Sequence, residues 1–169
     1  QHRQLGVHAL PHRRHDQHPS QRRLLTRPIA AVDLDGVVAD ARHRLHHIER
    51  RPKNWRAFFA EAADDEPLEE GLAVVAKLAE DHDIVFLTGR PAHLERLTRE
   101  WLARHGLDGH DLLMRPDSDR RPAAQVKPGL LRRYAGDREE AIVVDEETDV
   151  TAALAAAGTG PRKIGDAVI

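Results

Sequence analysis

The stretch of residues 29–37 limits most strongly what this chain can fold into. It reads Ile-Ala-Ala-Val-Asp-Leu-Asp-Gly-Val and opens as an apolar run after a proline, which is the pattern of a buried strand in a parallel sheet. Side chains alternate between the two faces of a strand, so Asp33 and Asp35 point the same way while Leu34 points to the core. Gly36 then frees the backbone to turn sharply.

Two carboxylates side by side at the carboxyl end of a strand lie where open α/β sheets place their active sites. Their charges repel each other, so such a pair favours a bound cation. The same residues also fit a strand that ends in an ordinary polar turn, because Asp and Gly are common turn formers. The rest of the chain has to decide between these two interpretations.

Apolar strands alternate with amphipathic helices along the remainder of the chain. Strand–helix–strand units in one sheet run parallel with right-handed crossovers, so the residues that follow each strand meet at one edge. We therefore expect an α/β fold with a parallel sheet and helices on both of its faces. The pattern predicts helices over residues 68–81, 92–105, 127–134 and 150–157, and further strands over residues 83–87, 112–114, 141–144 and 162–164.

Three further groups of polar residues fall at this predicted edge. Thr88, Gly89 and Arg90 follow the second strand, although Thr88 also suits a helix N-cap. Lys127 stands at the predicted start of a helix, where a cation opposes the helix dipole unless it meets an anion, and a surface lysine is the alternative. Asp145 follows the fourth strand and brings another carboxylate to this edge; Asp149, four residues later, also suits the first turn of the next helix.

These motifs, in this order over residues 29–149, resemble the haloacid dehalogenase (HAD) superfamily of phosphotransferases. The motifs are Asp33-Leu34-Asp35-Gly36, Thr88, Lys127 and the acidic segment with Asp145 and either Glu146 or Asp149. The resemblance implies a three-layer Rossmann-like fold over residues 28–169. It also implies a small helical cap, inserted after the first strand over residues 38–67.

The resemblance also implies a mechanism. Asp33 would attack phosphorus to form an aspartyl phosphate, and Asp35 would act as general acid and then base. Thr88 and Lys127 would hold the phosphoryl oxygens. Mg²⁺ would be bound by Asp33, the backbone carbonyl of Asp35, Asp145 and, as second choice, Asp149. A free aspartate has a pKa of about 3.9, so crowding by Asp33 would have to raise the pKa of Asp35.

One branch of the superfamily is more similar than the others, namely the 3′-phosphatase domain of phage-type polynucleotide kinases and its stand-alone bacterial relatives. The similarity lies in Asp-Gly-Val-x-Ala-Asp, His-Arg-Leu, Leu-Thr-Gly-Arg-Pro, Trp-Leu-x-x-His-Gly and Leu-Leu-Met-Arg-Pro. The acidic motif reads Asp145-Glu146-Glu147, whereas that branch often has Asp-Asp-Arg. The phosphate-binding loop of a kinase (Gly-x-x-x-x-Gly-Lys-Ser/Thr) does not occur in the sequence, so we expect no kinase domain in this chain.

The cap segment is basic up to residue 60, which favours an anionic substrate. We take four residues as candidates for substrate binding: Gly89, Arg90, Arg44 and Arg115. Trp55, Phe58 and Phe59 either stack on a base or, as their helical spacing favours, anchor the cap helix to the core. Residues 64–67 have the composition of a solvated acidic turn. A small cap leaves an open site, which favours a phosphorylated nucleic-acid 3′ end or a nucleotide as the substrate.

Composition excludes several other classes of protein. The 169 residues suit one folded domain, preceded by a His- and Arg-rich tail over residues 1–27 that we expect to be disordered. The absence of cysteine excludes thiol chemistry and disulfides. No apolar run approaches the roughly 18–20 residues of a membrane span, and no signal peptide is evident, so we expect a cytoplasmic protein without a membrane partner. The oligomeric state stays open.

Three functions fit the sequence. The first is a Mg²⁺-dependent phosphatase of nucleic-acid ends or nucleotides, and the second is a phosphatase of a small metabolite or phosphoprotein. The third is a binding module without catalysis. The presence of all the motif residues argues against the third, because a module that only binds does not need a nucleophile.

Overall fold

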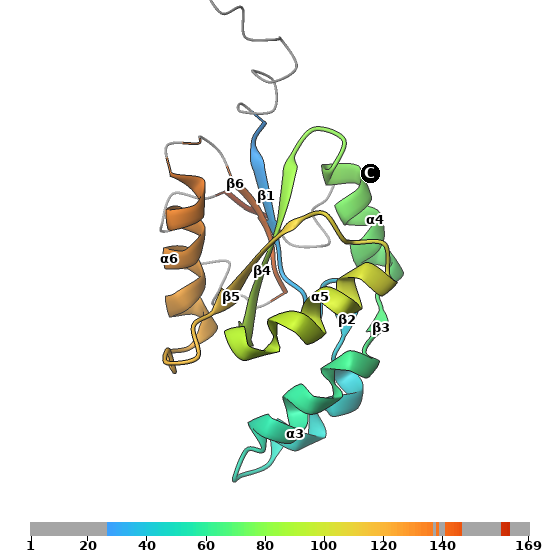
Figure 1. The fold of residues 1–169 in the computed structure, drawn as a ribbon, viewed down its shortest axis with the longest axis vertical. Helices are drawn as coiled ribbons and strands as arrows, with labels where there is room; N and C mark the ends of the chain where they lie inside the picture. The colour runs from blue at the N-terminus through green and yellow to red at the C-terminus, as the bar shows by residue number, and fades with distance from the viewer. Residues whose placement is uncertain (1–26, 137, 139–140, 147–159, 163–169) are drawn as a thin grey trace, which may run out of the picture.

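The described residues form a sheet of five parallel strands, which Figure 1 shows in the middle of the domain. The computed structural model describes residues 27–136, 138, 141–146 and 160–162. The strands lie in the order β5-β4-β1-β6-β7. Their bounds are Ile29–Val32 for β1, Asp83–Pro91 for β4, Asp111–Arg115 for β5, Ala141–Val144 for β6 and Gly160–Arg162 for β7.

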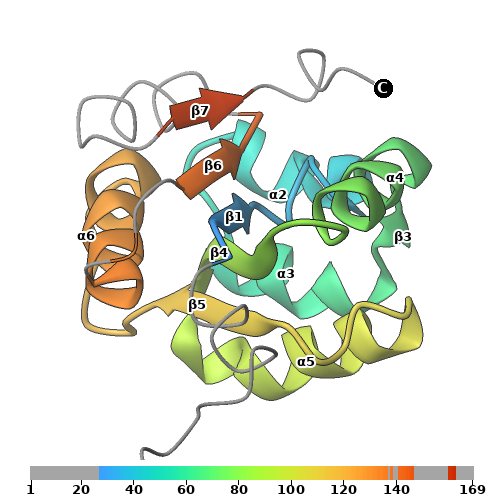
Figure 2. The ribbon, with the colours of Figure 1, turned by 90° about the horizontal axis from the view of Figure 1, so that it is seen from above.

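Helices cover both faces of the sheet, as Figure 2 shows. Alternate residues of β1 face opposite layers and all four are almost completely buried, which explains why the strand is apolar throughout. Ala30 and Val32 pack toward α4 (Glu69–Leu78) and α5 (Glu95–Arg104). Ile29 and Ala31 pack toward α6 (Ala123–Ala135). The predicted three-layer α/β fold is thus confirmed.

The element boundaries differ in places from those predicted. Strand β4 continues through Thr88 to Pro91, because β5 pairs with it as far as Pro91 and Arg115. The predicted helix over residues 92–105 is divided into the 3₁₀ turn η3 (Ala92–Leu94) and α5. Helix α6 begins four residues before Lys127, and β7 lies two residues earlier than predicted. The predicted helix over residues 150–157 lies outside the described residues.

The cap is a small insert that leaves the sheet after β1 (Figure 1). It comprises η1 (Arg42–Arg44), α2 (His46–Glu49), α3 (Trp55–Ala60) and η2 (Glu61–Asp64). Two short antiparallel strands, β2 (Ala39–Asp40) and β3 (Glu66–Pro67), close its base and were not predicted. Their pairing brings the two ends of the insert together at the edge of the domain.

Only part of the aromatic cluster in the cap acts as an anchor. Phe58 is buried, and its ring lies 4.1 Å from the guanidinium carbon of Arg44. Trp55 is 47% exposed, and its ring has Lys53 Nζ at 5.4 Å from the centroid. The anchoring interpretation is therefore correct for Phe58 and wrong for Trp55, because α3 is too short to bury all the residues on one face.

Arg27 belongs to the folded domain, although the sequence suggested that the basic tail runs to this residue. Its guanidinium donates hydrogen bonds to the carbonyls of Ala79 at 2.7 Å and His82 at 2.9 Å. Residues 1–26 of the predicted tail lie outside the described residues. None of the helices in the described ranges has the length and apolar character that a membrane crossing requires.

Gly71 in α4 allows the helix to pass directly over the turn that follows β1. A Cβ atom at this position would lie 1.8 Å from the carbonyl oxygen of Val37. Gly71→Ala is therefore expected to destabilise the fold by about 2 kcal/mol or more, since helix and turn have to separate. Gly129→Ala in α6 is the matched control, because no atom lies within 4 Å of its Cβ position.

The measurement is the Tm of both variants by circular dichroism. Gly129→Ala should match the wild type or gain up to about 1 kcal/mol, as expected for glycine replaced in a helix. Equal Tm values for Gly71→Ala and Gly129→Ala would contradict the close approach of α4 and Val37.

Candidate active site

Asp33 and Asp145 lie side by side because of the pairing of β1 with β6. Val32 is paired with Val144, so the next residue of each strand is an aspartate at the same edge. The backbone N–H of Asp33 donates to the Val144 carbonyl at 2.9 Å. Both carboxylates contact Lys127, whose Nζ lies 2.7 Å from Asp33 Oδ2 and 2.6 Å from Asp145 Oδ2. The structure therefore brings together three of the residues chosen from the sequence.

Burial dominates the ionisation of this group. It raises the pKa of Asp33, Lys127 lowers this pKa and Asp145 raises it again, with a net change from 3.8 to about 7. Burial also opposes the charge of Lys127, but the two carboxylates outweigh it and raise the lysine pKa above its usual range. Lys127 is thus held as an ammonium ion, deep in the second turn of α6 rather than at the start of the helix.

Asp35 is held by two arginines. Arg44 Nη2 donates to Asp35 Oδ1 at 2.7 Å, and Arg90 donates to the same oxygen through Nε at 3.1 Å and also through Nη2. Burial alone would raise the pKa of Asp35, but Arg90 and then Arg44 outweigh it and the pKa is lowered. The expectation that the pKa of Asp35 is raised is therefore wrong for this arrangement, because the two arginines outweigh burial and the neighbouring carboxylate of Asp33.

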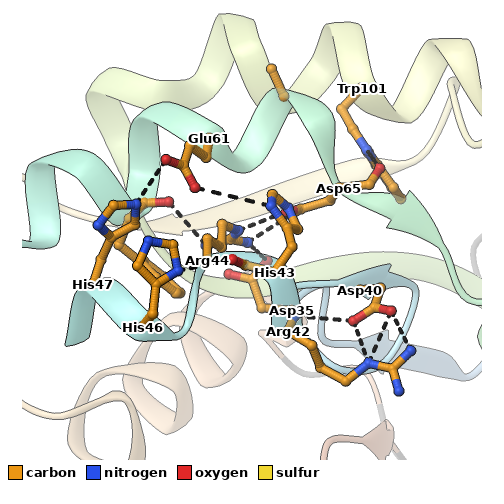
Figure 3. Close-up of polar contacts among 12 residues, drawn as sticks. Asp35, Asp40, Arg42, His43, Arg44, His46, His47, Glu61, Asp65 and Trp101 are labelled. Carbon is orange, nitrogen blue, oxygen red and sulfur yellow. Dashed lines mark hydrogen bonds and ion pairs between the residues drawn. The ribbon is translucent and has the colours of Figure 1, made fainter. Parts of the chain in front are cut away.

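Asp65 holds both arginines in place, although the sequence analysis assigned it to a solvated turn. Its side chain is fully buried and accepts a hydrogen bond from Arg44 Nε at 2.7 Å (Figure 3). It also accepts one from Arg90 Nη2 at 2.8 Å. Its backbone carbonyl accepts a 2.8 Å hydrogen bond from Trp101 Nε1. The turn is thus anchored in the core, and the solvated-turn interpretation is wrong for Asp65.

A signal for Asp65 was present in the sequence but indirect. Two buried arginines need carboxylate partners, and Asp35 alone offers too few oxygen lone pairs to satisfy both. Nothing in the local run Asp64-Asp65-Glu66-Pro67 distinguishes the buried acid from the exposed one before it.

The strand end of β4 supplies Thr88, Gly89 and Arg90. Thr88 is buried, and its hydroxyl oxygen accepts a hydrogen bond from the backbone N–H of Arg90 at 3.2 Å. Arg90 is also fully buried, and its Nη1 has no hydrogen-bond partner among the described residues. A Cβ at Gly89 would lie 3.7 Å from Ala123 Cβ, an ordinary contact at the start of α6.

Arg115, the fourth candidate for substrate binding, stands apart. It ends β5 opposite Pro91 and acts electrostatically on Asp117 and Asp119. No contact that joins it to Asp33, Asp35 or Asp145 is found among the described residues. Of the four candidates, the structure thus brings Arg44 and Arg90 to Asp35 and leaves Arg115 at the neighbouring strand end.

The donor set of this cluster fits a hard divalent cation. Every buried charged side chain in the described part of the chain belongs to it: Asp33, Arg44, Asp65, Arg90, Lys127 and Asp145. With Asp35, four carboxylates face three cations, so one negative charge remains to be balanced. Carboxylate oxygens are the ligands that Mg²⁺ prefers.

The candidate partners of Asp145 in cation binding are Glu146 and Asp149. The Glu146 carboxylate lies against the turn after β1, because a Cβ at Gly36 would be 1.9 Å from Glu146 Oε1. Gly36 has a φ of 81°, a conformation that favours glycine. Asp149 lies outside the described residues.

Comparison with known proteins agrees with this geometry. Residues 28–158 match the family described as the polynucleotide kinase PNKP phosphatase domain. A chain of the Pnkp1/Rnl/Hen1 RNA repair complex superposes with a TM-score of 0.63 at 22% identity, over 81% of this chain and 42% of that one. A second structure of a Pnkp1/Rnl/Hen1 complex gives the same TM-score and identity over 82% and 46%. The present chain thus spans less than half of either relative.

Smaller proteins with the same fold match over most of their length. A haloacid dehalogenase-like hydrolase from Streptococcus pneumoniae has a TM-score of 0.58 at 11% identity, over 79% of this chain and 82% of that one. Protein Tyrosine Kinase A from Mycobacterium tuberculosis has a TM-score of 0.58 at 16% identity, over 82% and 83%. No curated protein sequence matches the chain. At these identities the likenesses show the fold.

Proposed function

Because the chain belongs to the phosphatase-domain family of the polynucleotide kinase PNKP, which is of the haloacid dehalogenase type, we propose that it hydrolyses phosphomonoesters with Mg²⁺ through an aspartyl-phosphate intermediate. The observation that carries this proposal is the buried trio of Asp33, Lys127 and Asp145. A carboxylate nucleophile held by an ammonium ion beside a second carboxylate suits attack on a phosphoryl group and binding of a cation.

Asp33 is oriented for attack by contacts to both of its oxygens. Oδ1 accepts a 2.8 Å hydrogen bond from the Leu34 N–H, and Oδ2 lies 2.7 Å from Lys127 Nζ. In the first step an oxygen of Asp33 bonds to phosphorus, the bond from phosphorus to the ester oxygen breaks, and Asp35 gives that oxygen a proton. In the second step Asp35 takes a proton from water, which attacks phosphorus and releases phosphate and Asp33.

Asp33, Asp145 and the backbone carbonyl of Asp35 are the groups that would hold Mg²⁺. When bound, the ion supplies charge neutralisation for the attacking carboxylate and the phosphoryl oxygens. Lys127 adds a fixed positive charge on the same side, and it needs no reorganisation because both of its partners are already in place.

Arg90 is the residue best suited to exchange partners on substrate binding. It is fully buried, shares Asp35 with Arg44, and carries an Nη1 without a partner among the described residues. Phosphoryl oxygens that draw Arg90 from Asp35 would remove the main cause of the lowered pKa of Asp35. The same event would then bind the substrate and make Asp35 able to carry the proton.

Asp35→Asn tests the acid role. The variant should lose about 10²–10⁴-fold in kcat/KM on alkyl phosphates, which need a proton on the leaving oxygen. It should lose much less on nitrophenyl phosphate, whose leaving group departs as an anion. Asp40→Asn is the matched control, since it removes another aspartate that pairs with an arginine, Arg42, on the exposed side of the cap. Equal losses on the two substrates would contradict the acid role.

The features of the cap favour a nucleic-acid 3′-phosphate end or a nucleotide as substrate. The insert is small, and it presents an exposed Trp55 next to Lys53, a pairing suited to stack on a base near a phosphate. The two structural neighbours from Pnkp1/Rnl/Hen1 complexes, the first of which is described as an RNA repair complex, favour the same class of substrate. We propose such an end, in RNA or DNA, as the first substrate to test.

The experiment measures phosphate release with and without Mg²⁺ from a matched panel. The panel holds a 3′-phosphorylated oligonucleotide, its 5′-phosphorylated isomer, mononucleotides, a phosphopeptide and an aryl phosphate. We expect the wild type to prefer the 3′-phosphorylated oligonucleotide. Trp55→Ala should lose this preference and keep its turnover of the aryl phosphate. Turnover of only the small substrates or the phosphopeptide would contradict the nucleic-acid assignment and leave the chemistry intact. No Mg²⁺-dependent turnover of any substrate would contradict the enzymatic function in favour of a binding module.

A further inference from the structure

Three histidines and a glutamate gather in the cap, and one of the histidines, His43, adjoins Asp65 (Figure 3). His46 and His47 lie in α2, their rings 3.8 Å apart, and Glu61 begins η2. His47 Nε2 lies 2.8 Å from Glu61 Oε1. One ring nitrogen from each histidine and one carboxylate oxygen of Glu61 all lie within 4.8 Å of one another.

The tautomer of His46 suits metal binding. Its Nδ1 lies 3.0 Å from the backbone carbonyl of His43. A carbonyl oxygen only accepts, so Nδ1 carries the hydrogen and the neutral ring keeps its lone pair on Nε2. A histidine ligand whose other nitrogen donates to a carbonyl is the arrangement that orients imidazoles in metal sites.

His43 supports the group from outside. Its Nε2 contacts the buried Asp65 Oδ1 at 2.9 Å, and its Nδ1 lies 4.0 Å from Glu61 Oε2. Because the contact to Asp65 occupies Nε2, His43 is an outer partner rather than a ligand. It links Glu61 to the aspartate that holds Arg44 and Arg90.

We propose that His46, His47 and Glu61 bind one divalent transition metal ion, with Zn²⁺ the best fit, and that the ion fastens α2 to η2. Two imidazoles and one carboxylate form a ligand set for Zn²⁺ and not for Mg²⁺, which takes oxygen ligands. Ligand bonds of about 2.0–2.2 Å place the donor atoms of a tetrahedral ion about 3.3 Å apart. The His46 and Glu61 side chains are solvent-accessible, so small rotations close the set, and water completes it.

The ion would stabilise a part of the cap that has little core of its own. Among the cap residues described, α2 buries none of its side chains and η2 buries only Ala62. Residue 65 follows η2 directly, so fastening η2 also fixes the turn from which Asp65 reaches the two arginines.

The test is a calorimetric titration of the whole chain with Zn²⁺ in excess Mg²⁺, which occupies oxygen sites. The sequence also has five histidines among residues 1–18, so the informative quantity is the difference between variants. The wild type should bind one equivalent more than His47→Ala, or bind it at least about tenfold more tightly. His93→Ala is the matched control, because His93 forms an exposed pair with Asp117 outside the cap.

Glu61→Gln provides the second variant, since an amide still accepts a hydrogen bond from His47 but is a poor ligand. It should lose the same equivalent with an unchanged circular dichroism spectrum. Zn²⁺ should also raise the Tm of the wild type and of His93→Ala by more than that of Glu61→Gln. Equal stoichiometry, affinity and Tm shift in wild type and Glu61→Gln would overturn the proposal, as would equal losses in His93→Ala.

Discussion

Asp33→Asn is expected to abolish phosphate release and leave the fold intact. The amide cannot form the covalent intermediate, so kcat should fall by at least about a thousandfold. The fold should persist because asparagine has the same shape and its side-chain oxygen can keep the hydrogen bond from the Leu34 N–H. Lys127 also keeps Asp145 as a partner at 2.6 Å.

The raised pKa of Asp33 leads to a second, independent expectation for the same variant, which concerns its stability. Because the folded pKa of about 7 exceeds the ordinary value of 3.8, the folded state binds the proton more tightly than the unfolded state. Without metal, ionisation of Asp33 therefore lowers the free energy of unfolding as pH rises from about 4 to about 7. Asp33→Asn removes this loss, so its Tm at pH 8 without Mg²⁺ should equal or exceed that of the wild type.

The measurements are phosphate release and Tm at pH 5 and pH 8, each with and without Mg²⁺. Mg²⁺ should raise the Tm of the wild type more than that of Asp33→Asn, because the variant has lost a ligand. Asp108→Asn is the control for removal of an exposed aspartate, since it lies before β5 at the opposite edge of the sheet. Residual activity of Asp33→Asn above a few per cent would exclude Asp33 as nucleophile.

Asp65→Asn should have the largest effect on stability in this protein. The carboxylate is buried and binds Arg44 at 2.7 Å and Arg90 at 2.8 Å, so its loss leaves two buried cations with Asp35 as their remaining charged partner among the described contacts. Breaking a buried ion pair by removal of one partner costs about 3–5 kcal/mol. We expect a Tm lower by roughly 10 °C for a domain of this size.

Activity should fall as well, although Asp65 does not belong to the groups that react. Once both arginines lose their common anchor, they no longer hold Asp35 in one position, and a misplacement of about 1 Å at a reacting group costs about a hundredfold in rate. The measure is kcat/KM well below the Tm of the variant, where circular dichroism shows a folded protein.

Asp64→Asn supplies a strict control for this experiment. Asp64 precedes Asp65, carries the same charge and is exposed. Its replacement should change stability by no more than about 0.5 kcal/mol, as for other surface positions. If the two variants behave alike, Asp65 has no role as the anchor of the arginines.

The residues that follow the strands could be predicted from local pattern. In a parallel sheet the strands run in the same direction, so Asp33 after β1, Thr88 near the end of β4 and Asp145 after β6 reach one edge whatever the loops do. Lys127 was chosen because a cation near a helix start calls for an anion. Its position in the second turn of α6 shows that the residue was right and the helix boundary was not.

The partners of Asp35 could not be predicted in this way. Arg44 comes from the cap, whose base the β2–β3 pair closes, and Arg90 comes from β4, which pairs with β1, so the two arginines meet at Asp35 only in the folded chain. The sequence named both arginines as candidates for substrate binding. Nothing in the sequence indicated that these arginines lower the pKa of Asp35.

The sequence by itself determined the fold class and the edge at which the catalytic candidates gather, because strand alternation and parallel connections act over short distances along the chain. The tertiary structure alone decided the charge state of that edge. Asp65 is bonded to Trp101, Arg90 and Arg44, which lie 36, 25 and 21 positions away from it in the chain. Such contacts leave no periodic signal, and in a low-dielectric interior they outweigh the local crowding of Asp33 and Asp35.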